Sequence, residues 1–269
     1  ACAESLTPVV IEGGGKDAVL IDRDADLDTA AEQTVFGAMG NAGQTCAGVE
    51  RIYVHKDVHE AFVHKFTAKV RALAPGTSIS SSYGPMTLPS QVDVIRRHVK
   101  DAIARGGKAL VGGEESVGDR IVEPVVLVDV PEDSTAITEE TFGPTVVINK
   151  VDDLEEAVEK ANAVNYGLGS AIFTKDRKRG LALAEKVDAG MVSINSFLAF
   201  AGIAALPFGG SGESGFGRIH GADGLREFVR PRSITVERFS APLNLMTMTR
   251  KPRDIKIVKW MLANVQGKL

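Results

Sequence analysis

The stretch SAIFTKDRKRGLALAEKVDAGMVSINS, residues 170–196, contains a strand, a helix and a second strand in succession. Residues 170–174 and 190–196 are short, mostly apolar runs typical of strands, whereas residues 176–187 have the composition of a helix. A helix between two strands is the usual crossover between parallel neighbours of one sheet. This segment therefore predicts a parallel sheet with helices packed on it.

The same alternation extends from this segment toward the N-terminus. Further strands are expected at residues 7–12, 18–22, 50–54, 108–113, 121–130 and 143–151, and helices at residues 24–40, 57–76, 92–106 and 152–167. We expect the helix at 57–76 to begin with a capping box formed by Asp57 and Glu60. The predicted fold class is α/β, a layered parallel sheet with helical crossovers.

The alternation ends near residue 232, which divides the chain into a domain at 1–232 and a tail at 233–269. The tail opens with a last predicted strand at 234–239 and continues with many basic residues. A basic amphipathic helix can lie on a membrane, but packing on its own domain or on a neighbouring subunit is commoner and is our expectation. One face of that helix would carry four apolar residues, Ile255, Val258, Leu262 and Val265.

Composition narrows the classes of function. The 269 residues carry a formal net charge of -4 and the pI is near 5.8, so we expect no nucleic-acid partner, which would require a clustered basic surface. Two cysteines cannot build a disulfide framework, and we find neither an apolar run of about 18 residues nor a signal-peptide pattern. The expected location is the cytoplasm.

Two patterns resemble ligand sites but lack the context that such sites need. GGSGESG, residues 209–215, matches the dinucleotide pattern G-x-G-x-x-G, but it comes near the end of the predicted sheet and not after its first strand. The five histidines show no ligand spacing with cysteine or carboxylate residues, so we expect no metal site.

Cys46 lies in the loop NAGQTCAGV, residues 41–49, among small side chains that let a ligand approach the backbone. A nucleophilic cysteine needs an accessible, electropositive setting, because only the thiolate attacks carbonyl carbon well. From the residues alone, a loop cysteine without a role stays open as the alternative.

Glu12 ends the apolar run PVVI, which we expect to be a buried strand. A carboxylate at the end of such a strand is desolvated, which suits a general base working near neutral pH. Sites in parallel sheets also tend to lie at the carboxyl ends of the strands. The alternative is a strand-end acid that accepts hydrogen bonds from loop amides.

Five segments, in this order and spacing, resemble the aldehyde dehydrogenase superfamily over residues 5–238. They are IEGGGKDAVLIDRDADLDTAA, NAGQTCAGVERIYV, EETFGPTVVI, NYGLGSAIFTKD and LPFGGSGESGFGR. The matched part is the family's C-terminal catalytic domain. We find no counterpart of the preceding coenzyme-binding domain, which in the family carries the dinucleotide loop and an oxyanion-hole asparagine, so we expect this chain alone to be a poor dehydrogenase.

The resemblance implies oxidation of a small-molecule aldehyde to a carboxylic acid with NAD or NADP. Cys46 matches the family's nucleophile, which forms a thiohemiacetal and then a thioester, and Glu12 matches the general base that activates water. Glu140 resembles the nicotinamide-ribose ligand, and Phe142 resembles a residue near the nicotinamide.

The substrate side is less regular. Asn195 and Phe208 resemble positions at the aldehyde entrance, although Phe208 suits a plain core position equally well. The apolar stretch between them, residues 196–207, favours a hydrophobic aldehyde over a charged one. Gly13 stands where the family usually has a bulky residue, which could loosen the loop that follows Glu12.

Two rival functions remain. Coenzyme A-acylating semialdehyde dehydrogenases often lack a glutamate at the position of Glu12, so Glu12 favours hydrolysis, and a non-catalytic module that keeps the fold is the other rival. The strand at 234–239 resembles the family's intersubunit strand, so the full-length parent is expected to be a homo-oligomer.

Overall fold

The computed structural model describes residues 1–239, 247–249 and 251–264. Residues Ala1–Val229 form one compact unit, and Arg230–Leu269 fall into a second. The first unit contains a sheet of seven strands in the order β4-β5-β6-β3-β2-β8-β9. These strands are β2 (Asp17–Ile21), β3 (Val49–His55), β4 (Lys108–Val111), β5 (Val125–Val128), β6 (Thr145–Val151), β8 (Gly169–Phe173) and β9 (Met191–Ile194).

Every neighbouring pair in this sheet is parallel except β4 and β5, so the α/β prediction is confirmed and the parallel prediction is wrong for β4. The reason lies in the connection. Between β4 and β5 the chain forms only a short 3-10 turn, η2 (Glu114–Ser116), and not the α-helix that usually joins parallel neighbours.

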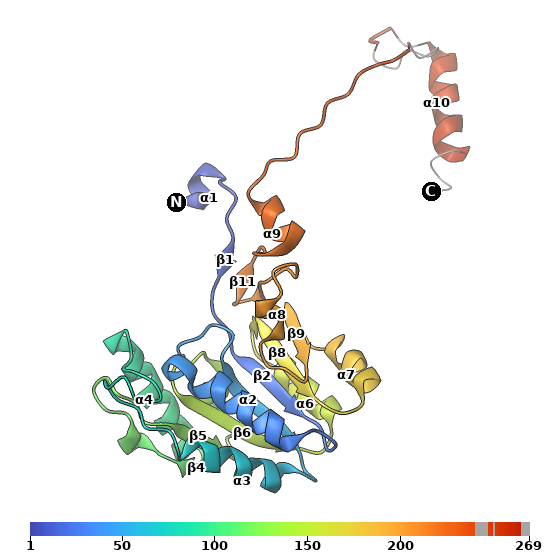
Figure 1. The fold of residues 1–269 in the computed structure, drawn as a ribbon. Coiled ribbons are helices and arrows are strands. Elements are labelled where there is room, and N and C mark those ends of the chain that lie inside the picture. The colour runs from blue at the N-terminus through green and yellow to red at the C-terminus, as the bar shows by residue number, and fades with distance from the viewer. Residues whose placement is uncertain (240–246, 250, 265–269) are drawn as a thin grey trace. The chain divides into compact units, whose positions relative to one another are not determined.

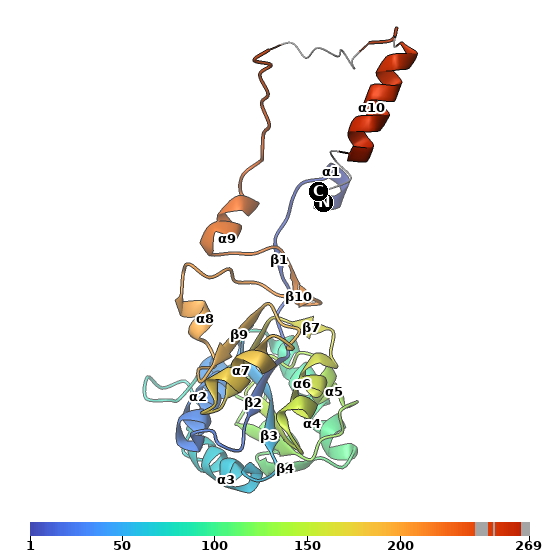
Figure 2. The same ribbon diagram turned by 90° about the vertical axis from the view of Figure 1, so that its right-hand side faces the viewer.

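Helices cover both faces of the sheet (Figures 1 and 2). The strand residues alternate between two cores: Val19 and Ile21 of β2 pack in one, whereas Ala18 and Leu20 pack in the other. The first core is covered by α2 (Leu27–Met39), α3 (His59–Val70) and α4 (Pro89–Ala104), and the second by α6 (Leu154–Asn162) and α7 (Arg177–Ala184). The predicted layered architecture is thus confirmed.

The helix starts differ in how they are capped. Asp26 caps α2 by accepting hydrogen bonds from the N–H groups of Asp28 and Thr29. The predicted capping box of α3 is wrong, because the helix begins at His59 and Val58, not Asp57, occupies the cap, without a side-chain bond. Asp57 instead lies 3.6 Å from His55 Nδ1.

The strand expected at residues 7–12 is wrong in length and burial. Only β1 (Ile11–Glu12) forms, it is exposed, and it pairs antiparallel with β11 (Gly215–Phe216) outside the main sheet. Both edges of β2 are already paired with β3 and β8, so the residues that precede β2 have no place in that sheet. The remaining short elements of this unit are α1 (Cys2–Ser5), η1 (Gly40–Gly43), α5 (Thr135–Thr138), β7 (Tyr166–Gly167), α8 (Ala199–Gly202), β10 (Ser211–Gly212) and α9 (Gly221–Glu227).

In the second unit, residues 234–239 form no strand, and Ile234 and Val236 are 74% and 80% exposed. A strand needs a hydrogen-bonding partner, and no described part of the chain provides one for these residues. The expected tail helix is present as α10 (Pro252–Asn264), with Ile255 and Leu262 about half exposed. Val265 lies outside the described residues. No helix among the described residues is long and apolar enough to cross a membrane.

Candidate active site

Four of the predicted site residues, Glu12, Cys46, Glu140 and Phe142, lie before the amino ends of the parallel strands, not at the carboxyl ends that we expected. Residues 12–16 precede β2, residues 44–48 precede β3, and residues 139–144 precede β6. The register places the first residues of β2 and β3, Asp17 and Val49, side by side, so the loops before them meet. The candidate site therefore lies at the amino ends of the strands, because the loops that carry its reactive side chains precede β2, β3 and β6.

Close backbone contacts hold the Cys46 loop in place. Gly43 has φ +68, and a Cβ there would lie 2.0 Å from the carbonyl oxygen of Gly143. A Cβ on Gly15 would lie 2.9 Å from the carbonyl oxygen of Cys46. Glycine is thus required at both contacts, which join the Cys46 loop to the loops before β6 and β2.

Cys46 itself is half-buried and packs against an apolar cluster of Ala47, Leu168, Met191, Phe200 and Phe208. Burial raises the pKa of the Cys46 thiol, and the nearby charge of Glu12 raises this pKa further, while the N–H of Ala47 acts in the opposite direction. The electropositive setting that we expected is therefore wrong for this chain. Cys46 has carboxylate neighbours, and of these Glu12 raises the pKa of its thiol most.

Glu12 is exposed, so the desolvation expected from a buried strand is wrong. Its position beside the Cys46 thiol leaves it reachable by water and close to the sulfur. This is the arrangement that a base needs if it is to take a proton first from the thiol and later from water.

Glu140 contacts the glycine loop that follows Glu12. Its Oε1 accepts a 2.9 Å hydrogen bond from the Gly15 N–H, and a Cβ on Gly14, at φ +84, would lie 2.2 Å from the same oxygen. Burial raises the pKa of Glu140 to about 7; the Gly15 N–H bond opposes this, and the charges of Glu50 and Glu12 add to it.

The residues around Glu140 fit one end of a nicotinamide cofactor. Glu140 offers carboxylate oxygens that can accept bonds from ribose hydroxyls, and Phe142 offers a partly exposed aromatic ring. Lys16, the cation in the described loops before β2, β3 and β6, is paired with the carboxylate of Glu50. The nicotinamide-ribose end therefore fits here, while the diphosphate finds no free cation in these loops.

Sequence reasoning missed the buried charges beneath these loops. Lys16 and Glu50 are 1% and 6% exposed, and Asp17 is 6% exposed with its Oδ1 accepting a 3.0 Å bond from the Gly169 N–H. Burial holds the pKa of Asp17 well above its ordinary value. The sequence signal was the position of two charged residues at the starts of apolar strands. Lys16 directly precedes β2, and Glu50 is the second residue of β3.

Asn195 and Phe208 have different surroundings. Phe208 is 9% exposed and belongs to the cluster that Cys46 contacts. Asn195 follows β9 at the carboxyl edge of the sheet, about 13 Å along the strand from Met191 in the Cys46 cluster. Its side chain donates to Thr174 O and accepts from Thr174 N–H, both at 2.9 Å, so the structure does not bring Asn195 to Cys46.

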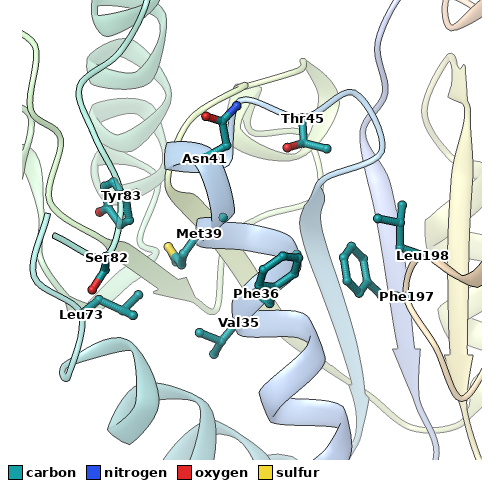
Figure 3. Close-up of a pocket in the computed structure, with 12 residues that line it drawn as sticks. Val35, Phe36, Met39, Asn41, Thr45, Leu73, Ser82, Tyr83, Phe197 and Leu198 are labelled. Carbon is teal, nitrogen blue, oxygen red and sulfur yellow. The ribbon is translucent and has the colours of Figure 1, made fainter. Parts of the chain in front are cut away.

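A pocket of about 360 Å³ lies next to the Cys46 loop (Figure 3). Thr45 lines it, and Leu198 both lines it and packs against the Cys46 cluster. Phe36 of α2 faces Phe197, with ring centroids 6.0 Å apart. The other lining residues are Val35, Gly37, Met39, Gly40, Asn41, Leu73, Ser82 and Tyr83.

Three polar side chains that line this pocket already form hydrogen bonds within the chain. The Tyr83 hydroxyl donates to Val122 O at 3.0 Å, Asn41 Nδ2 donates to Gln44 O at 2.9 Å, and the Ser82 hydroxyl oxygen accepts from the Ala74 N–H at 3.0 Å. None of the described residues that line the pocket is charged. The pocket therefore suits an apolar group.

Comparison with known proteins gives a consistent result. The aldehyde dehydrogenase family model matches residues 1–234. A putative succinate-semialdehyde dehydrogenase [NADP(+)] 2 of Mycobacterium ulcerans is 39% identical over 232 residues, which are 84% of this chain and 45% of that relative. The 4,4'-diapolycopene aldehyde oxidase of a Methylomonas species is 39% identical over 235 residues, which are 87% of this chain and 44% of that relative.

Solved structures show the same fold. The putative aldehyde dehydrogenase PutA of Anabaena variabilis matches with a TM-score of 0.83 and 33% identity, covering 90% of this chain and 53% of that one. Betaine aldehyde dehydrogenase of Staphylococcus aureus, solved in complex with NAD+, matches with a TM-score of 0.78 and 31% identity, covering 84% of this chain and 46% of that one. This chain spans about half the length of the relatives that it matches. By sequence and by fold, the chain belongs to the aldehyde dehydrogenase family.

Proposed function

We propose that residues 1–232 are the catalytic domain of an NAD(P)-dependent aldehyde dehydrogenase that oxidises an aldehyde to a carboxylic acid. The observation that carries this proposal is the Glu12 carboxylate beside the Cys46 thiol. Glu140 supports it, because it is bonded to the same glycine loop and can accept bonds from a ribose.

In the proposed mechanism, Glu12 takes the thiol proton and passes it to solvent, to which it is exposed, so that it is again a base for the later step. The Cys46 sulfur forms a bond to the aldehyde carbon while the π pair of the C=O bond moves to the oxygen, giving a thiohemiacetal anion. NAD(P), when bound, supplies the acceptor for the hydride that leaves this carbon. The product on Cys46 is a thioester. Glu12 then takes a proton from water, the resulting hydroxide attacks the thioester carbon, and the carbon–sulfur bond breaks to release the acid and restore Cys46.

The proposed substrate is an uncharged, apolar aldehyde. The pocket beside Thr45 has aromatic and aliphatic walls and no charged side chain among its described lining residues. The Mycobacterium ulcerans relative is named for succinate semialdehyde, which carries a carboxylate. A carboxylate buried in the pocket of this chain would lack a partner, and burying an unpaired charge is costly.

The experiment compares hexanal and benzaldehyde with succinate semialdehyde in the full-length protein that carries this chain. NAD(P)H formation should depend on Cys46 and Glu12, with kcat/KM at least about tenfold higher for the apolar aldehydes. Absence of NAD(P)H with all three aldehydes would refute the dehydrogenase proposal. A preference for succinate semialdehyde would refute the substrate class alone.

The rivals make different predictions. A coenzyme A-acylating enzyme would release an acyl-coenzyme A product, whereas Glu12 beside Cys46 supports transfer to water. A non-catalytic module would leave Cys46 no more reactive than a peptide thiol.

We further propose a cytoplasmic homo-oligomer in which residues 233–239 pair with another subunit and residues 253–264 pack on protein.

A further inference from the structure

The proposed mechanism gives no role to the buried Glu50 carboxylate, which lies between the loop that follows Glu12 and the loop of Glu140. Glu50 is on β3, and Lys16 ends the glycine loop that follows Glu12. Lys16 Nζ forms an ion pair with Glu50 Oε2 in a nearly solvent-free position. A buried ion pair is weak evidence for stability, because the cost of desolvating two charges can exceed their attraction. The pair therefore calls for another explanation.

Glu50 holds two successive backbone amides in the loop of Glu140. Its two oxygens accept from the Thr141 N–H at 3.1 and 2.9 Å, and Oε1 accepts from the Phe142 N–H at 2.8 Å. Phe142 has φ +48, a left-handed conformation that an aromatic residue rarely adopts. Such a conformation persists only where the surrounding contacts impose it, and Glu50 supplies those contacts.

Lys16 ties the same loop from the other side. Its Nζ donates to Thr141 Oγ1 at 3.0 Å, and the preceding residue, Gly15, donates its N–H to Glu140 Oε1 at 2.9 Å. The segment after Glu12 and the segment 140–142 are therefore joined at two adjacent points, both within a few residues of the proposed base and cofactor ligand.

We infer that Glu50 is a positioning residue that holds Glu140 and Phe142 in place for the cofactor, with Lys16 as its ion-pair partner. This inference rests on the proposed function for the roles of Glu140 and Phe142. Glu50 acts through the backbone of the loop and contacts neither substrate nor reacting atoms.

The first test is amide hydrogen exchange on this chain without cofactor. In the unsubstituted chain, the Thr141 and Phe142 amides should exchange at least about 100-fold more slowly than in an unstructured peptide. Glu50→Gln should accelerate both by about tenfold or more, because the amides lose a charged acceptor. Exchange at the peptide rate in the unsubstituted chain would overturn the inference without any variant.

Asp22→Asn is the matched control. Asp22 is also a buried carboxylate, 1% exposed and paired with Arg179, but it follows β2 at the opposite edge of the sheet. It should leave exchange at Thr141 and Phe142 within about twofold. Equal acceleration by Asp22→Asn and Glu50→Gln would show a general loss of stability and would overturn the assignment.

A second variant separates positioning from folding. Replacing Lys16 and Glu50 together by Met leaves no unpaired charge, so the fold should survive while the loop loses its tether. The two amides should then exchange faster, and in the full-length protein the KM for NAD(P) should rise about tenfold with acetylation of Cys46 by p-nitrophenyl acetate unchanged. Unchanged exchange and unchanged KM would overturn the inference. Exchange needs no turnover, so an inactive protein with the expected exchange would refute only the proposed function.

Discussion

The Glu140 carboxylate accepts a 2.9 Å hydrogen bond from the backbone N–H of Gly15, three residues after Glu12. The proposed cofactor ligand and the proposed base are thereby attached to one short loop, although residues 15 and 140 are far apart in sequence. The contact requires glycine at position 14, since Gly14 has φ +84 and a side chain there would overlap the Glu140 carboxylate.

Gly14→Ala should therefore lower the free energy of unfolding by about 1 to 3 kcal/mol, because alanine is strained at this φ and its Cβ would overlap Glu140. Urea denaturation of the chain measures the change. Gly84→Ala is the matched control, since nothing lies within 4 Å of a Cβ at that position. Equal stability of the two variants would contradict the described loop.

Stability should fall as the pH rises from about 4.5 to about 7 through the contribution of Glu140. Its folded-state pKa of about 7 lies above the ordinary 4.5, so the folded chain holds a proton in this range that the unfolded chain has lost. The check is the free energy of unfolding at both ends of the range for the unsubstituted chain and for Glu140→Gln. The variant should show a smaller fall, and an identical pH dependence would count against the buried carboxylate.

Phe36→Ala should lower kcat/KM for hexanal by about 5- to 30-fold, the loss expected when an apolar contact of about 1 to 2 kcal/mol is removed from a binding pocket. Steady-state kinetics in the full-length protein measure it. Leu181→Ala changes an exposed residue of α7, on the other face of the sheet, and should have no effect. A Phe36 variant with unchanged kinetics would exclude this pocket as the aldehyde site.

Asn195→Ala should cost about 2 kcal/mol of stability, because the two bonds to Thr174 are lost and Ala tolerates the φ of +58 less well. Acetylation of Cys46 should be unaffected, since Asn195 lies at the other edge of the sheet. Thermal denaturation measures the stability of the variant, and p-nitrophenyl acetate measures the rate of Cys46 acetylation. Unchanged stability with slower acetylation of Cys46 would place Asn195 in the substrate site.

The sequence was sufficient for the features that depend on local periodicity. Phe62, Phe66 and Val70 of α3, and Leu154, Ala157, Val158 and Ala161 of α6, recur at helical spacing in the sequence and are buried in the structure. It was insufficient where long-range pairing decides. The fate of residues 7–10 depended on which strands pair with β2, and the direction of β4 depended on its connection to β5.

The site divides in the same way. Cys46 and Glu12 could be identified from their motifs, and the structure places them together. The environment of Cys46 could not be predicted, because the carboxylates that act on it, Glu12 and Asp17, belong to a different segment of the chain. The Lys16–Glu50 ion pair could not be predicted for the same reason, because it forms only when two separate segments of the chain pack together.

The most direct measurement is the rate at which p-nitrophenyl acetate acetylates each cysteine of this chain, located by peptide mass spectrometry. Cys2 is exposed and provides an internal reference, whereas burial and Glu12 raise the pKa of Cys46. We expect faster acetylation of Cys46 than of Cys2, and accumulation of acetyl-Cys46 in Glu12→Gln because hydrolysis slows by about 100-fold or more. Acetylation of Cys46 no faster than that of Cys2, with no effect of Glu12→Gln, would contradict the proposed mechanism.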